Sequence, residues 1–321
     1  MSKKVLCKAA GIVVIAALAL NMGACTKKDH KEQDAFRQYG ITCLESGDYE
    51  AAVESFQKAL DQSLGKVGKK ELDICFYKAR AQYLNGDTED ALETYNAIIK
   101  YNKDARAYYL RGKLYFDLGD QEKALADYQE AAERAEDDYE LYIGIYESMC
   151  SQGMEADGQK YLNQALDRKG DKPKDCLYKG RISYLLGDNK GAVDYLTKAK
   201  EGKEELASYY LGLVYEAEGD KEKYQACIQE YIDSGVATSY ELYDLGMNEM
   251  EKSHYKQAIT YFEAGLALEE VPNKQNLMKS TIAAYEYRGD FDSAKKVMKE
   301  YLSLYPSDED AKRESIFLET R

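Results

Sequence analysis

Hydrophobic positions in this chain recur at helical spacing, in pairs of segments separated by a short polar turn. The clearest pair runs from Tyr108 to Ala132, where two amphipathic stretches flank Gly119 and Asp120. Apolar residues three and four positions apart form one stripe along each helix. Gly favours the end of the first helix, and Asp suits the start of the second. The segment therefore predicts a helical hairpin.

The turn glycine of this hairpin returns at a spacing of about 34 residues. Its copies are Gly47, Gly86, Gly119, Gly153, Gly187, Gly219 and Gly289, with Ser253 filling the one gap. An Asp follows six of these eight turns. Because Gly adopts the left-handed backbone that ends many helices, the period predicts eight helical hairpins that each turn at this position.

Three further columns keep the same phase: a small residue after the turn, a large apolar residue one helical turn later, and a residue before the turn that is often glycine. The glycines of the last column are Gly40, Gly112, Gly180, Gly212 and Gly246. A glycine inside a helix costs about 1 kcal/mol relative to Ala, so its repetition predicts close helix packing.

Two hairpins exchange large and small residues between the glycine column and the small column. One has Tyr146 and Gly158, and the other has Gly212 and Tyr224. We expect each Tyr to fill the volume that its glycine partner leaves, since swaps that conserve volume are tolerated best in a core.

The pattern resembles the tetratricopeptide repeat over about residues 33–306, in its period and in its glycine, aromatic and alanine positions. The resemblance implies an all-α, right-handed superhelical solenoid, with eight repeats over residues 35–306. A capping helix over residues 307–321 follows, with Ser307 as its N-cap. Ile316 and Phe317 or Leu318 would cover the last apolar face.

The N-terminus has the features of an export signal. Lys3, Lys4 and Lys8 precede an apolar run over residues 9–20, which is too short to span a bilayer. The following Met22-Gly23-Ala24-Cys25 resembles a bacterial lipoprotein signal, in which residues 1–24 are removed and Cys25 receives lipid, palmitate included. An ordinary secretory signal with an incidental cysteine is the alternative. Residues 25–34 are predicted to form a polar tether.

Composition narrows the function classes. The net charge is -14 with 58 acidic residues, which argues against nucleic-acid binding because that generally needs a basic surface. Only two histidines occur, His30 and His254, which argues against a His-based metal site or a His general base. The sequence contains no P-loop, zincin or nucleophile-elbow pattern. We therefore expect no cofactor, no metal and no enzymatic activity.

Five cysteines remain in the body of the chain: Cys43, Cys75, Cys150, Cys176 and Cys227. Each falls within a helical pattern, mostly on its apolar side, and the five belong to five different repeats. An exported chain could form disulfides, but the pattern favours small hydrophobic residues in a core.

The resemblance also implies that the first helix of each repeat lines a concave groove. Projection of this sequence onto that geometry predicts the groove residues Phe76, Arg80, Tyr83, Arg106, Tyr109, Lys113, Phe116, Arg181, Tyr184, Tyr209 and Tyr243. It also places Lys174, Leu177, Leu213, Tyr240, Met247 and Met250 there. The cations Arg80, Lys113 and Arg181 occupy equivalent positions. A solvated surface of a purely structural array is the alternative.

The sequence thus predicts a lipid-anchored scaffold on the extracytoplasmic side of a cell membrane. Its groove would bind a peptide or a partner protein of the cell envelope. A receptor that stacks its tyrosines on an oligosaccharide or a cell-wall fragment is the alternative, which the absence of Trp weakens.

Overall fold

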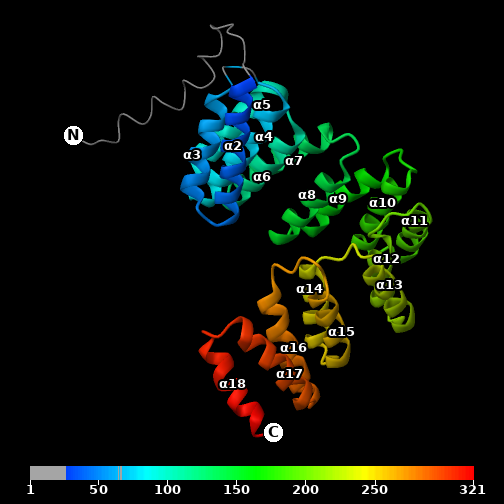
Figure 1. Ribbon diagram of the computed structural model, residues 1–321. Helices are drawn as coiled ribbons and strands as arrows, with labels where there is room; N and C mark the ends of the chain where they lie inside the picture. Colours follow the sequence, from blue (N-terminus) through cyan, green and yellow to red (C-terminus); the bar gives the residue numbers. More distant parts are fainter. Residues whose placement is uncertain (1–26, 64, 66) are drawn as a thin grey trace. The chain divides into compact units, whose positions relative to one another are not determined.

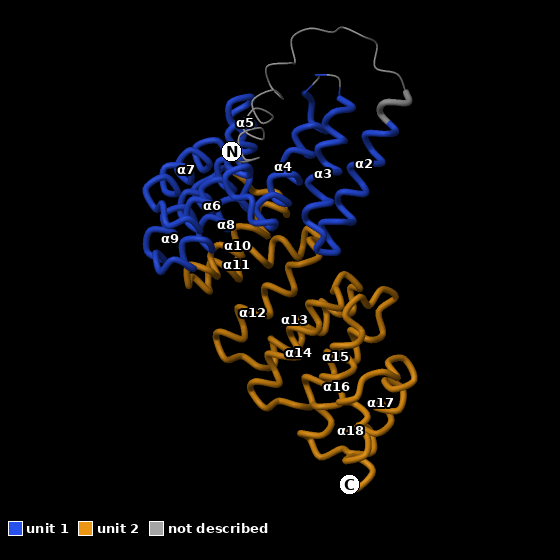
Figure 2. Tube along the Cα trace, turned by 90° about the vertical axis from the view of Figure 1, so that its left-hand side faces the viewer, with its two compact units in different colours: residues 1–169 blue, residues 170–321 orange. Residues whose placement is uncertain are grey.

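The structure is a computed structural model that describes residues 27–321 apart from 64 and 66. These residues form 17 helices and no strand, so the all-α prediction is confirmed for this part of the chain (Figure 1). The helices group into two compact units, residues 1–169 and residues 170–321 (Figure 2). The predicted right-handed winding of the whole array concerns both units together and stays a prediction.

Unit 1 consists of four helical hairpins. Its helices are α2 (Lys27–Glu45), α3 (Tyr49–Asp61), α4 (Lys69–Leu84), α5 (Thr88–Asn102), α6 (Ala105–Asp117), α7 (Gln121–Arg134), α8 (Tyr139–Ser151) and α9 (Glu155–Leu166). Even numbers mark the first helix of each hairpin, and odd numbers mark the second.

Unit 2 consists of four hairpins and one further helix. Its helices are α10 (Pro173–Leu185), α11 (Asn189–Glu201), α12 (Ala207–Glu218), α13 (Lys221–Asp233), α14 (Ser239–Glu251), α15 (Tyr255–Leu266), α16 (Lys274–Arg288), α17 (Phe291–Leu304) and α18 (Glu309–Glu319). The eight hairpins and the last helix confirm the number of repeats predicted from the period.

The turn column adopts the predicted backbone. All seven of its glycines have positive φ, and Ser253 does too, at 61°. The Asp after the turn caps the second helix in five of the six hairpins that have it, as where Asp120 accepts a hydrogen bond from the amide of Lys123. Local chemistry therefore sets where each hairpin turns.

The glycine column packs against the large column of its own hairpin. A Cβ built on Gly112 would lie 2.7 Å from the Tyr128 ring, and one built on Gly246 would lie 2.2 Å from the Phe262 ring. The prediction of close packing is therefore confirmed. Each large side chain lies directly on the backbone of the neighbouring helix.

The predicted exchange of large and small residues is confirmed in one hairpin and wrong in the other. A Cβ on Gly158 would lie 3.0 Å from the Tyr146 ring. The atoms nearest to Gly212, however, belong to Ile228 and Cys227. Tyr224 instead points its hydroxyl to that of Tyr261, 3.4 Å away in the next hairpin. Its size therefore fills space between two repeats rather than within one.

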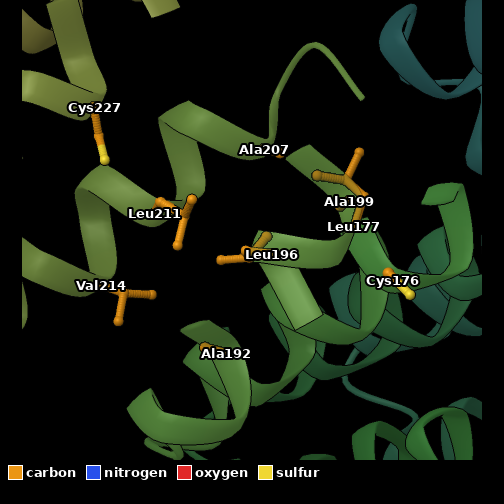
Figure 3. Packing of buried hydrophobic residues seen from close by; sticks show 9 residues of the cluster. All are labelled: Cys176, Leu177, Ala192, Leu196, Ala199, Ala207, Leu211, Val214 and Cys227. Atoms are coloured by element: carbon orange, nitrogen blue, oxygen red, sulfur yellow. The ribbon is translucent and has the colours of Figure 1, made fainter. Parts of the chain in front are cut away.

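Buried apolar side chains form separate clusters along each unit, as expected when every repeat packs mainly on its neighbours. Figure 3 shows one of them in unit 2, where Leu177, Leu196 and Leu211 gather between α10, α11 and α12. Cys176 and Cys227 belong to this cluster. The five cysteines of the described residues are free thiols, and three of them are buried, in agreement with the core interpretation.

The ends of the chain differ from the sequence predictions. Helix α2 begins at Lys27, so residues 27–34 of the predicted tether are helical, and Gln33 is buried with its amide on Glu71. The predicted signal peptide over residues 1–24 and the predicted lipidation site Cys25 lie outside the described residues. Among the described residues, no helix combines the length and the apolar character needed to cross a bilayer.

At the C-terminus, a last helix covers the end of the array as predicted. Of the predicted apolar contacts, Leu318 is confirmed, whereas the N-cap residue differs from the prediction. Asp308, not Ser307, is the N-cap, and its carboxylate accepts from the amide of Ala311. Leu318 provides the buried apolar contact, whereas Ile316 and Phe317 are exposed. Leu318 lies seven residues after the buried Ala311, so the two share the side of α18 that packs on the core.

Candidate functional site

The first helices α4 and α6 of unit 1 carry seven of the predicted groove residues. The hydroxyl of Tyr83 on α4 donates to Asp117 on α6 at 2.8 Å. The guanidinium of Arg106 on α6 lies 4.7 Å from the centre of the Phe76 ring on α4. These two contacts bring α4 and α6 together at both ends of the face.

Arg80, Arg106 and Lys113 are the exposed cations of this face. Burial raises the pKa of the nearby Tyr95 hydroxyl to about 12, and the charges of Arg106 and Arg80 act in the opposite direction. Both guanidinium groups therefore lie close enough to the same hydroxyl to influence it. Within the described residues, none of the three cations forms an ion pair, so their charge is available to a partner.

Most of the predicted aromatic residues of unit 1 lie beneath this face, in the core, and not on its surface. Phe76 and Phe116 are buried, at 9% and 7% exposure. Phe116 and Tyr109 both pack on the ring of Tyr128, at 5.5 Å and 5.9 Å between ring centres. Phe76 and Phe116 are thus core residues, which corrects their prediction as partner-binding residues. Tyr83 is the exposed aromatic residue of the set.

Tyr109 has an intermediate position. Its hydroxyl would lie 2.7 Å from a Cβ built on Gly144, so it packs against α8 and extends the face from α6 to the next first helix. Burial raises the pKa of Tyr109, and the charge of Glu147 raises it further. Next to the cations of α4 and α6, the following first helix, α8, therefore carries the acidic residue Glu147.

The predicted groove residues of unit 2 form a different environment. The guanidinium of Arg181 lies 5.7 Å from the centre of the Tyr210 ring. Tyr184 is half-buried against the core cluster of α10 to α13. Tyr209 packs on Tyr231 at 5.1 Å between ring centres, and Tyr243 packs on Phe262 at 6.0 Å. Each tyrosine thus has one side in the core and one side toward solvent.

Burial raises the pKa of Tyr209, and the negative charges of the Glu241 and Asp244 carboxylates add to the effect. Asp244 belongs to α14, so α12 and α14 share one face at this point. This face is acidic, whereas the α4–α6 face is basic. The predicted residues of α12 and α14 therefore lie in an acidic setting, whereas those of α4 and α6 lie beside exposed cations.

The sequence interpretation missed the strongest polar contact of unit 1. Arg111 on α6 forms a bidentate pair with Asp127 on α7, at 2.8 Å and 2.6 Å, and also reaches Asn96 on α5 at 2.5 Å. Both charged side chains are largely buried. The hydrogen bonds that Arg111 donates to Asp127 are the main cause that raises the pKa of Arg111. The sequence signal that could have identified this contact is that Arg111 aligns with core positions of the other repeats.

The acidic residues on the unit 2 face, Asp244 and Glu251, were also missed. The signal was present in the sequence, because residues 204–272 contain 15 Asp and Glu but only four Lys and no Arg. Among the described residues, no group of three or more His, Cys, Asp or Glu side chains has the arrangement of a metal site. The two faces can thus present charged and aromatic side chains to a partner, on helices that core packing holds in place.

Comparison with known proteins identifies the repeats. Models of the tetratricopeptide repeat match residues 44–114, residues 105–138 and residues 275–308. The matches fall on the hairpins described above, in both units. The chain therefore contains tetratricopeptide repeats, and the resemblance inferred from the sequence is confirmed at that level.

Individual similar proteins are distant. The chain is 24% identical over 175 residues to DnaJ homolog subfamily C member 3 from Bos taurus, covering 53% of this chain but 31% of that protein. A tetratricopeptide repeat protein from Parabacteroides merdae is 14% identical, with 79% of this chain and 99% of that chain covered at a TM-score of 0.46. PilW, a type IV pilus biogenesis factor, is 16% identical, with 77% and 99% covered at a TM-score of 0.42.

Proposed function

We propose that this chain is a non-enzymatic scaffold that binds a protein segment rich in carboxylates on the α4–α6 face. The observation that carries the proposal is the group of exposed, unpaired cations Arg80, Arg106 and Lys113 in a protein whose net charge is -14. Unpaired cations on a rigid helical face attract and orient carboxylates. Proteins built from these repeats generally act as binding scaffolds.

The packing beneath the cations supports a binding role. Phe76, Phe116 and Tyr128 are buried, and they fix α4 and α6 from below. A face whose backbone is already fixed loses little entropy when a partner binds. Tyr83 adds an exposed ring beside the cations, where an apolar or aromatic side chain of the partner can pack.

We further propose that the scaffold is held at the extracytoplasmic surface of a membrane by lipid on Cys25. Support comes from the sequence, in which a basic segment, a short apolar run and a small-residue box precede that cysteine. Two or more acyl chains give durable attachment, because each buried methylene contributes about 0.8 kcal/mol. The partner would then be another protein of the cell envelope.

The binding proposal is tested by charge reversal. The variant carries Arg80→Glu, Arg106→Glu and Lys113→Glu, and the matched control carries Lys100→Glu, Lys190→Glu and Lys299→Glu, which change exposed lysines on second helices. After crosslinking in intact cells, the partner should co-purify with the native protein and with the control but not with the variant. All three proteins should melt at the same temperature. Equal recovery with all three would overturn the proposal, and recovery of a glycan without a protein would favour an oligosaccharide receptor.

The anchor is tested separately. Native protein should incorporate labelled palmitate and sediment with membranes, and Cys25→Ser should do neither. Membrane attachment of Cys25→Ser equal to that of the native protein would refute lipid anchoring at this residue without affecting the binding proposal.

A further inference from the structure

The first helices α12 and α14 of unit 2 present a face that the proposed function does not use. On α14, the residues Tyr240, Tyr243, Asp244, Met247 and Glu251 recur at spacings of three and four, so they share one side of the helix. Tyr240 is 56% exposed, which is unusual for a large aromatic side chain in the middle of an array.

This face extends over neighbouring helices. The charge of Asp244 acts on the hydroxyl of Tyr209 on α12, and the hydroxyl of Ser280 on α16 lies 3.7 Å from the sulfur of Met247. Three consecutive first helices therefore contribute to a surface made of aromatic rings, methionine and carboxylates. Methionine is flexible and polarizable, so it adapts to apolar side chains of different shapes.

The carboxylates of the face are available. Within the described residues, neither Asp244 nor Glu251 forms an ion pair, and both are exposed. Two of the four lysines over residues 204–272 form ion pairs with other carboxylates, since Lys223 pairs with Asp220 and Lys252 bridges Glu216 and Glu249. The surplus of acidic residues over residues 204–272 is therefore not neutralised locally.

The same alignment position shows how this face differs from the first unit. Where α4 and α6 have Arg80 and Lys113, α12 and α14 have Leu213 and Met247. The position that holds a cation in α4 and α6 therefore holds an apolar side chain in α12 and α14, and carboxylates lie beside that apolar side chain. Such a surface repels acidic segments and complements basic ones.

We infer that the α12–α14 face binds a cationic amphipathic segment of a partner protein, with its apolar side chains on Tyr240 and Met247 and its Lys or Arg side chains on Asp244 and Glu251. Apolar anchors at spacings of three and four on the partner would match those of α14. The site lies on a different unit from the α4–α6 face and takes a partner of opposite charge.

The test uses the full chain and two fluorescent peptides of equal length, one an amphipathic helix of Leu and Lys and the other its counterpart of Leu and Glu. The Leu-Lys peptide should bind, and the Leu-Glu peptide should not bind to this face. The variant Asp244→Lys with Glu251→Lys should weaken binding of the Leu-Lys peptide at least about tenfold, and Tyr240→Ala should weaken it several-fold.

The matched control carries Glu222→Lys and Glu270→Lys, which change the net charge equally but lie outside the face. It should alter affinity less than twofold. An equal loss in variant and control would show unspecific charge attraction and overturn the inference, as would the absence of binding to the native chain. Reversal of Arg80 and Lys113 should leave this binding intact, so failure here is distinguishable from failure of the proposed function.

Discussion

Unit 1 and unit 2 use the same hairpin for surfaces of opposite character. Gly112 on Tyr128 in the first unit and Gly246 on Phe262 in the second are one packing arrangement repeated. At the surface, however, α4 and α6 expose Arg80 and Lys113, whereas α14 exposes Tyr240 and Asp244. The positions that pack within the hairpin have the same residue types in both units, whereas the solvent-exposed positions differ in charge and polarity. The two binding sites that we propose therefore both rest on the divergent positions.

The interior shows a related difference, which gives the largest expected effect. Arg111 and Asp127 form a buried ion pair in the α6–α7 hairpin of unit 1, and the equivalent positions of the α12–α13 hairpin of unit 2 hold the apolar pair Leu211 and Cys227. Asp127→Ala should destabilise the protein by about 3–5 kcal/mol, because it leaves an unpaired guanidinium in the core. Chemical denaturation measures the loss.

A double variant, Arg111→Leu with Asp127→Cys, places the residues of the α12–α13 hairpin in the α6–α7 hairpin. It should recover most of the stability that Asp127→Ala loses, since replacing both partners of a buried pair with apolar residues is often neutral. A double variant as unstable as the single one would show that the two interiors are not interchangeable.

The shared packing arrangement can be tested with Gly112→Ala and Gly246→Ala. The added methyl group overpacks the core, which destabilises by about 1–3 kcal/mol. The higher helix propensity of Ala offsets roughly 1 kcal/mol of that loss. Both variants should be destabilised in thermal melts. Gly246→Ala should lose more, because its Cβ would lie 2.2 Å from the Phe262 ring, against 2.7 Å from Tyr128 for Gly112→Ala. Neutral behaviour in one unit only would break the equivalence of the two frameworks.

A third difference concerns how consecutive first helices are joined. In unit 1, the amide of Gln33 on α2 donates to the carboxylate of Glu71 on α4 at 2.8 Å. In unit 2, Glu286 on α16 faces Glu314 on α18, and its buried Oε1 has no hydrogen-bond partner. Burial, with the charge of Glu314, raises the pKa of Glu286 from 4.5 to about 7.

The sign of the resulting pH dependence follows from linkage. The folded protein holds this proton up to a pH of about 7, and the unfolded chain releases it near 4.5. Stability from this group is therefore complete below pH 4.5 and is lost as the pH rises to 7. Glu286→Gln, which imitates the Gln33–Glu71 pair, should remove that part of the pH dependence and raise the melting temperature at pH 8. Parallel melting profiles of variant and native protein between pH 5 and 8 would contradict this.

The smallest effect is expected at the turns. Ser253 has a φ of 61° where the equivalent residue of unit 1, Gly119, has 76°. A non-glycine residue with positive φ destabilises the folded state by about 1–2 kcal/mol. Glycine avoids this strain, but it loses more conformational entropy on folding, which offsets part of the gain. Ser253→Gly should therefore stabilise by about 0.5 kcal/mol, and Gly119→Ser should destabilise by a similar amount in denaturant titrations.

Sequence alone predicted features that depend on near neighbours in the chain. Gly119 and Ser253 mark turns because φ is a property of one residue, and Asp120 caps the next helix because its carboxylate reaches an amide three residues on. The eight hairpins and the last helix follow from the repetition of these local signals. The resemblance to the tetratricopeptide repeat rests on the same positions.

The tertiary structure decided what depends on a neighbouring helix. Phe76 and Tyr240 were both predicted to line the groove, yet Phe76 is buried beneath Arg106 and Tyr240 is exposed. Tyr224 pairs with Tyr261 of the next hairpin instead of filling the space at Gly212. Helical periodicity fixes the side of a helix on which a residue lies, but the side chains packed across from it fix how much remains exposed. The sequence thus determined the array, and packing between helices determined which residues of its faces can meet a partner.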